Sequence, residues 1–272
     1  MIFRPASHFV ASISLLALTV GLSLTALAGQ KQEARVTQVT QDVQLIGTNA
    51  SPRRATVNDI VSEGTKVRTG ADSRGELTFD NKTVARLGAN AVFDFRDGTR
   101  NLNLEEGVLL LQIPKSAKGV RVCAAQIAAA VTGTTVVLES YPTYYKFLVL
   151  NGTARLYRPG HLGDSILLKA GQMAFGQPKA VLSDPVDFDI GRFLKTSRFI
   201  TDFPPLGSET LMAGESQKQQ REKSKKSLID TNLVILGGGT MVSLVDPAQV
   251  AAIDQGKSQL AKPSPAPTAA PR

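Results

Sequence analysis

Apolar and polar residues alternate with a period near two from about Arg35 to Phe175, and turn residues interrupt the alternation. Interruptions at intervals of about 8–12 residues are typical of short strands joined by tight turns, and they predict an all-β domain. So many short strands suit a sandwich, a roll or a short β-solenoid. The units recur without the fixed period that would single out a solenoid. The β domain is predicted to cover residues 35–178.

Two short turn sequences predict hairpins in the second half of this domain. Asn151-Gly152 separates two alternating segments, and Asn-Gly suits a two-residue turn that needs positive φ at both positions. Ala170-Gly171 separates another pair. The predicted strands are residues 144–150 and 153–157 around the first turn, and residues 165–169 and 172–175 around the second.

Two further turns are predicted in the first half of the domain. Residues 80–82 lie between Glu76–Phe79 and Thr83–Leu87, which predicts a hairpin. Glu106-Gly107 lies between two short apolar segments, 101–104 and 108–111, and is predicted to separate two strands.

The pattern changes after Pro178, which predicts a C-terminal extension over residues 179–260. Asp187 to Ile200 has apolar residues at helical spacing and is predicted to form a short helix. Residues 208–226 are rich in lysine and predict an exposed helix or a disordered linker, and residues 231–245 predict a strand pair. The last segment, 261–272, is rich in Pro and Ala and predicts a disordered tail.

The N-terminal segment has the layout of a secretory signal. Arg4 precedes an apolar run from Phe9 to Leu27, and Ala26 and Ala28 provide the small residues that signal peptidase recognises. Residues 1–28 are therefore predicted to be a signal peptide that is cleaved after Ala28. The alternative is an uncleaved membrane anchor, because the run approaches the roughly 20 residues that span a bilayer.

Composition narrows the possible chemistry. The net charge of +8 favours contact with anionic surfaces, but aromatic residues make up only 6% and no basic stripe interleaves with them, so nucleic acid is not expected as a partner. Cys123 is the only cysteine and cannot form an intrachain disulfide. With His8 in the signal, His161 is the only histidine left, and no Gly-x-Ser-x-Gly motif accompanies it. No catalytic, cofactor-binding or metal-binding residue is predicted, because zinc sites need clustered Cys and His and the acidic turns lack EF-hand spacing.

Several segments together resemble a FecR-type domain, named for the ferric-citrate regulator. Gly64–Gly70, Ser73–Phe79 and Ala85–Gly88 look like its first half. The second half is carried by residues 104–110, 131–134, 149–152 and 170–172, so that the resemblance covers about residues 36–176. The residues that carry the family pattern are Gly70, Ser73, Arg74, Leu87, Gly88, Gly107, Gly133, Thr134, Asn151, Gly152 and Gly171.

The resemblance implies a periplasmic β domain that senses or binds a partner and has no catalytic residues. Founding members of the family are anti-sigma transducers with a cytoplasmic segment ahead of a membrane helix, whereas eight residues precede the apolar run here. We therefore expect a non-catalytic exported domain, periplasmic or secreted, that binds a protein or glycan of the bacterial cell envelope. It would contact the membrane only if the N-terminal segment is retained. The alternatives are a membrane-anchored anti-sigma-type regulator and an unrecognised hydrolase of envelope polymers.

Overall fold

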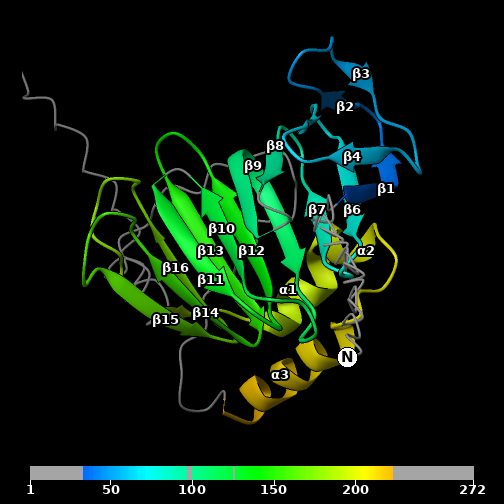
Figure 1. The fold of residues 1–272 in the computed structure, drawn as a ribbon. Helices are drawn as coiled ribbons and strands as arrows, with labels where there is room; N and C mark the ends of the chain where they lie inside the picture. Colours follow the sequence, from blue (N-terminus) through cyan, green and yellow to red (C-terminus); the bar gives the residue numbers. More distant parts are fainter. Residues whose placement is uncertain (1–32, 97–99, 125, 223–272) are drawn as a thin grey trace, which may run out of the picture. The chain divides into compact units, whose positions relative to one another are not determined.

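The computed structural model describes residues 33–96, 100–124 and 126–222 (Figure 1). The predicted signal peptide, the end of the Lys-rich segment, the strand pair at 231–245 and the tail lie outside these residues. The described chain is mostly β, with short helices after the last strand, which confirms the predicted fold class.

The strands form two layers. The first layer, sheet A, is antiparallel throughout. Its strands, in spatial order, are β4 (Ile60–Ser62), β1 (Glu33–Thr40), β6 (Arg74–Phe79), β7 (Val84–Leu87), β9 (Asn101–Gln112), β12 (Thr135–Ser140), β13 (Tyr145–Asn151), β16 (Gln172–Gly176) and β17 (Val186–Asp187).

The second layer, sheet B, is antiparallel except for the parallel pair β9 and β10. Its strands, in spatial order, are β3 (Arg53–Arg54), β2 (Val43–Ile46), β5 (Lys66–Thr69), β8 (Val92–Arg96), β9, β10 (Val120–Ala124), β11 (Ile127–Val131), β14 (Thr153–Tyr157) and β15 (Ser165–Lys169).

Strand β9 belongs to both layers. Its first half pairs with β8 and β10 in sheet B, and its second half pairs with β7 and β12 in sheet A. At the crossing point Gly107 has φ 95°, and a Cβ there would lie 2.5 Å from the Cα of Ala91. A glycine with this backbone angle bends the strand without ending it. The predicted turn at Glu106-Gly107 was therefore wrong, since residues 101–112 form one strand.

The two predicted hairpins of the second half were also wrong. β13 pairs with β12 and β16 in sheet A, whereas β14 pairs with β11 and β15 in sheet B. Asn151-Gly152 thus carries the chain from one sheet to the other, and of the two residues only Gly152 has positive φ. Ala170-Gly171 carries it back to sheet A. The hairpin of β6 and β7 is confirmed, with Lys82 at φ 65° in its turn.

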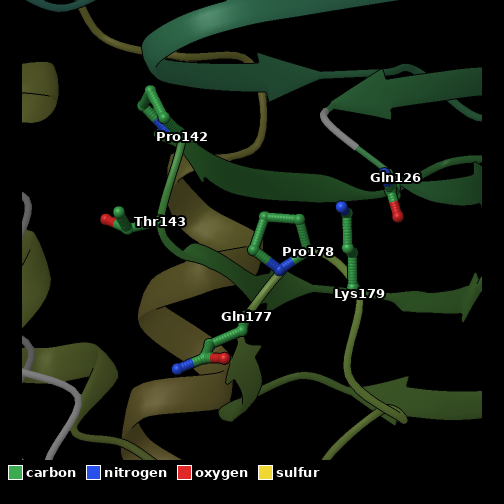
Figure 2. A pocket seen from close by; sticks show the side chains of 6 residues that line it. All are labelled: Gln126, Pro142, Thr143, Gln177, Pro178 and Lys179. Carbon is green, nitrogen blue, oxygen red and sulfur yellow. The ribbon is translucent and has the colours of Figure 1, made fainter.

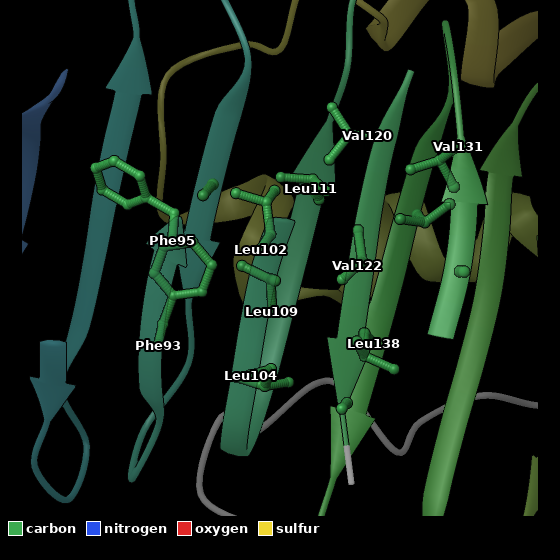
Figure 3. Packing of buried hydrophobic residues seen from close by; sticks show 14 of the residues in the cluster. Phe93, Phe95, Leu102, Leu104, Leu109, Leu111, Val120, Val122, Val131 and Leu138 are labelled. Atoms are coloured by element: carbon green, nitrogen blue, oxygen red, sulfur yellow. The ribbon is translucent and has the colours of Figure 1, made fainter. Parts of the chain in front are cut away.

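Alternate side chains of both sheets fill the space between the layers. Phe79 and Phe95 meet edge to face there, with their ring centroids 5.0 Å apart. Figure 3 shows part of this core, drawn from four strands of sheet B together with the second half of β9 and β12. Its labelled residues, all at most 4% exposed, are Phe93, Phe95, Leu102, Leu104, Leu109, Leu111, Val120, Val122, Val131 and Leu138.

Three C-terminal helices cover the outer face of sheet A: α1 (Ile190–Thr196), α2 (Arg198–Thr201) and α3 (Glu209–Glu222). The helix predicted near 187–200 is thus confirmed as two short helices, and the described part of the Lys-rich segment is a helix. The residues buried between sheet and helices include Val108, Leu110, Val137, Leu148, Leu150, Met173, Phe188, Ile190, Phe193, Phe199 and Met212.

Among the helices of the described residues, none combines the length and the apolar character required to cross a bilayer.

Candidate functional site

The first residues of the family pattern shape the connection between β5 and β6. The hydroxyl of Ser73 is buried, donates to the carbonyl of Ala71 at 2.9 Å and accepts from the amide of Asp42 at 3.0 Å. Arg74 is 7% exposed and pairs with Asp202 at 3.0 Å. Apart from Arg74 Nε, which has no hydrogen-bond partner among the described residues, these groups are paired inside the protein, so the turn serves the fold.

Other residues of the pattern maintain close packing. Leu87 is in the core between the sheets, and a Cβ on Gly88 would lie 3.1 Å from the ring of Phe199. The hydroxyl of Thr134 lies 2.9 Å from the carbonyl oxygens of both Thr132 and Thr153.

Four glycines of the pattern, Gly107, Gly133, Gly152 and Gly171, have positive φ, whereas Gly70 does not. Gly133 has φ 62° and packs on Lys115, and Gly171 has φ 81° and packs on Gln219 of α3. Ala26 and Ala28 lie outside the described residues. The pattern residues that the structure describes therefore serve the fold, and they do not converge on one cavity.

A buried charge pair fastens the C-terminal segment to sheet A. The Arg86 guanidinium donates to Glu76 at 2.7 Å and to the carbonyl oxygens of Phe199 and Pro204. It also lies over the ring of Phe203, at 4.7 Å from the ring centroid. Burial lowers the pKa of Arg86, and the adjacent Glu76 opposes this shift and keeps the guanidinium charged.

A second buried pair lies on the same face of sheet A. Lys146 and Glu139 are 2.6 Å apart, with exposed side-chain fractions of 3% and 0%. Tyr144 donates to the other carboxylate oxygen of Glu139 at 2.9 Å. Burial, together with the charge of Glu139, raises the pKa of Tyr144. These side chains present almost no surface to solvent, so the pair is a structural element and has no access to a substrate.

Loops at one end of the sandwich surround an open depression of about 580 Å³ (Figure 2). Its lining comes from the β10–β11 and β12–β13 connections and from the segment after β16. The lining residues are Gln126, Pro142, Thr143, Gln177, Pro178 and Lys179. They offer amides, a hydroxyl and one ammonium group, which suit hydrogen bonding to a partner and lack the paired acid and base of a hydrolase.

The residues that could carry catalysis or bind a metal are dispersed. His161 is exposed, and its ring lies 3.2 Å from the carbonyl of Pro159 in its own loop. In the described part of the chain, no group of three His, Cys, Asp or Glu side chains is close enough to hold a metal ion.

One known protein family matches part of this chain. The family described as FecR protein matches residues 65–155, which run from β5 into β14. The chain contains a FecR domain. The resemblance seen in the sequence is confirmed over this segment. The FecR domain therefore contributes strands to both sheets and includes β9, which joins them.

Solved structures provide a more distant comparison. Two crystal structures of a protein from Parabacteroides distasonis described as a "putative anti-sigma factor" are each 13% identical to this chain. Their TM-scores are 0.41 and 0.42; the matches cover 50% and 71% of this chain, and 70% and 91% of the other. No curated protein matches.

Proposed function

We propose that the chain is an exported, non-catalytic binding module whose FecR domain recognises a protein or glycan partner in the cell envelope. The match to the FecR family over residues 65–155 carries the proposal, because FecR proteins are generally regulators without catalytic activity and their domains are typically periplasmic.

The use of the buried charged groups supports a binding role. Two ion pairs lie inside the protein and hold strands and helices together. They are Glu76 with Arg86, and Glu139 with Lys146. Catalytic groups with shifted pKa values normally line a cleft that a substrate can enter. In this chain the two buried ion pairs do not line a cleft that a substrate could enter. A partner would therefore bind at the accessible surface.

The fold restricts where a partner can bind. Helices α1–α3 already cover the outer face of sheet A. The loop depression around Pro142 and Pro178 and the outer face of sheet B are accessible among the described residues. A partner of the FecR domain is expected at one of these.

A membrane-anchored signal transducer is the second candidate, and the apolar run from Phe9 to Leu27 favours it. Retention of this run would hold the same domain at the membrane. Cleavage after Ala28 would release it.

The test uses the full chain, produced in bacteria with its own N-terminal segment and a C-terminal affinity tag. Mass spectrometry of the purified protein should find Gly29 as the first residue, and the protein should fractionate with the periplasm or medium. An N-terminus that retains residues 1–28 in the membrane fraction would instead support the transducer.

Binding is tested by retention of envelope components on the tagged protein, with a tagged, unrelated periplasmic protein as control. A defined component should be enriched, and incubation with purified envelope polymers should yield no soluble fragments. Turnover that is abolished by substitution of an acidic residue would overturn the proposal in favour of a hydrolase.

A further inference from the structure

The outer face of sheet B carries a strip centred on β11. Arg121 of β10, Ala130 of β11 and Arg155 of β14 are register neighbours across three adjacent strands. Two residues along β11, Ala128 lies opposite Tyr157 and is only 1% exposed, because neighbouring side chains cover it. These side chains point away from the core, because the residues that alternate with them on the same strands are in the cluster between the sheets.

The small residues of β11 make this strip a trough. Alanine side chains end at Cβ, so the longer side chains of β10 and β14 rise on both sides. Arg121 reaches across β11 toward Tyr157, with its guanidinium carbon 5.9 Å from the ring centroid. Next to it, a depression of about 320 Å³ continues along Ala130, Thr132 and Gly119.

The positive charges of this strip have no acidic partners among the described residues. Arg121, Arg155 and Lys169 are exposed, and the one side-chain hydrogen bond of Arg155 goes to the hydroxyl of Ser165 at 3.3 Å. Elsewhere on this sheet Lys66 pairs with Glu105, Arg96 with Asp94 and Arg53 with Asp59, whereas Arg54 and Arg68 bond to the uncharged Gln41 and Gln44. Positive charge without an acidic partner therefore occurs at two places on sheet B: around β10, β14 and β15, and at Arg54 and Arg68 on β3 and β5.

We propose that this strip, defined by Arg121, Ala130, Arg155, Tyr157 and Lys169, is a binding site for an acidic polysaccharide. The inference rests on the proposed function and names its partner. Guanidinium groups bind carboxylates through paired hydrogen bonds, and an aromatic ring provides a flat apolar face for a sugar ring. Arg121 and Arg155 lie two strands apart, about 9.6 Å at the usual strand spacing, so both can contact carboxylates of a linear chain that lies over the Arg121 side chain.

The strip is less suited to other anionic polymers. A protein interface is anchored by apolar and aromatic side chains that become fully buried. Beside this strip, Leu167 is the one large aliphatic side chain among the described residues that is exposed, at 49%, so the strip lacks such anchors. Single-stranded nucleic acid needs a series of aromatic residues on which successive bases stack, and Tyr157 is the single aromatic ring of the strip.

The experiment measures binding of the full chain to polygalacturonate, a linear polymer with one carboxylate on each sugar. Dextran is the neutral control, and poly-L-glutamate represents an acidic polypeptide. We expect saturable binding to polygalacturonate that weakens as salt is raised, weaker binding to poly-L-glutamate, and none to dextran. Equal or tighter binding to poly-L-glutamate would overturn the proposal in favour of an acidic protein partner.

Two double variants with the same change in net charge locate the site. Arg121→Gln with Arg155→Gln should weaken polygalacturonate binding about tenfold, since exposed ion pairs contribute up to about 1 kcal/mol each. Arg54→Gln with Arg68→Gln, exposed on β3 and β5 of the same sheet, should change it less than twofold at equal salt. Equal losses in the two double variants would overturn the site.

Tyr157→Ala tests the contribution of the aromatic face. It should weaken binding to polygalacturonate more than binding to poly-L-glutamate, and equal effects would contradict a role in sugar recognition. Circular dichroism and thermal unfolding establish that each variant is folded. If the wild-type chain retains an envelope component but does not bind polygalacturonate, this inference fails and the proposed function stands.

Discussion

Glu139 and Lys146 lie directly opposite each other on β12 and β13, and their side chains form an ion pair of 2.6 Å beneath the C-terminal layer. A buried pair adds little compared with apolar residues of the same size, but removal of one partner leaves an uncompensated charge. The pair therefore makes the fold sensitive to single substitutions at either position.

Lys146→Met should lower the free energy of unfolding by about 3–5 kcal/mol, because it leaves Glu139 buried without a counter-charge. Urea unfolding measures the loss. Glu139→Leu combined with Lys146→Met should recover most of it, and Lys169→Met on an exposed strand should stay within about 0.5 kcal/mol of wild type. A loss in Lys146→Met no larger than in Lys169→Met would show that the pair is not buried as described.

Arg86→Met should loosen the C-terminal segment as well as destabilise the sheet. The substitution removes the donor to the carbonyl oxygens of Phe199 and Pro204 and leaves Glu76 unpaired, for a cost of about 3–5 kcal/mol. Amide hydrogen exchange should accelerate at Ile200 and Asp202, whose amides bond within this segment. Arg198→Met, at the more exposed pair with Asp202, should cost no more than about 1 kcal/mol. Unchanged exchange in Arg86→Met would contradict the fastening role.

Gly107→Ala should destabilise the protein by about 3 kcal/mol or more, since the new Cβ overlaps Ala91 and the backbone angle is unfavourable for alanine. Gly214→Ala is the matched control, because a Cβ there meets no atom within 4 Å on helix α3. Alanine should stabilise that helix by about 0.5–1 kcal/mol. Thermal unfolding compares the two, and similar effects in both would refute the crossing geometry at Gly107.

Ionisation of Tyr145 is expected to lower the free energy of unfolding at alkaline pH. Burial raises the pKa of Tyr145 to about 12 from its ordinary value of 10. The unfolded chain then loses this proton first, so the stability that is present below pH 10 falls as the pH rises toward 12. Two pKa units correspond to at most about 2.7 kcal/mol, which is the upper limit of the contribution of Tyr145. Burial also raises the pKa of Tyr141 to about 12, which adds to the loss in the same range.

Tyr145→Phe should remove that contribution while it leaves stability at pH 7 within about 1 kcal/mol of wild type. Its hydroxyl makes no hydrogen bond within the described residues, so little is lost at neutral pH. Urea unfolding at pH 7, 10 and 11.5 measures the difference. The same fall with pH in the variant and the wild type would exclude Tyr145 as its source.

The sequence allowed prediction of the strands better than of their partners. Period-two alternation identifies a strand because it depends on neighbouring residues, and the helix near Phe193 followed from local spacing in the same way. Asn151-Gly152 is a favourable local turn, but pairing with β12, β16, β11 and β15 decides which sheets its flanking strands join. Those contacts are distant in sequence and cannot be derived from a two-residue motif.

Burial on both faces of sheet A was also missed, although a signal existed. Phe147-Leu148-Val149-Leu150 is continuously apolar, which is typical of a strand covered on both sides. Glu139 and Lys146 alternate with residues of the core between the sheets, so alternation alone does not predict that they are buried. Their burial depends on α1–α3, whose docking on the sheet has no local pattern. The strip on β11 was likewise hidden, because Arg121, Ala130 and Arg155 meet only when three strands are aligned.

The boundaries of the FecR match have a practical consequence. Because β9 ties the two layers together, a fragment limited to residues 65–155 would keep strands of both sheets but lose neighbours on either side. It would expose the ladder groups of β6 and β13 in sheet A, and of β5 and β14 in sheet B. Four bare edges invite association between copies. A fragment that keeps the native neighbours of these four strands therefore has to extend at least from β1 through β16.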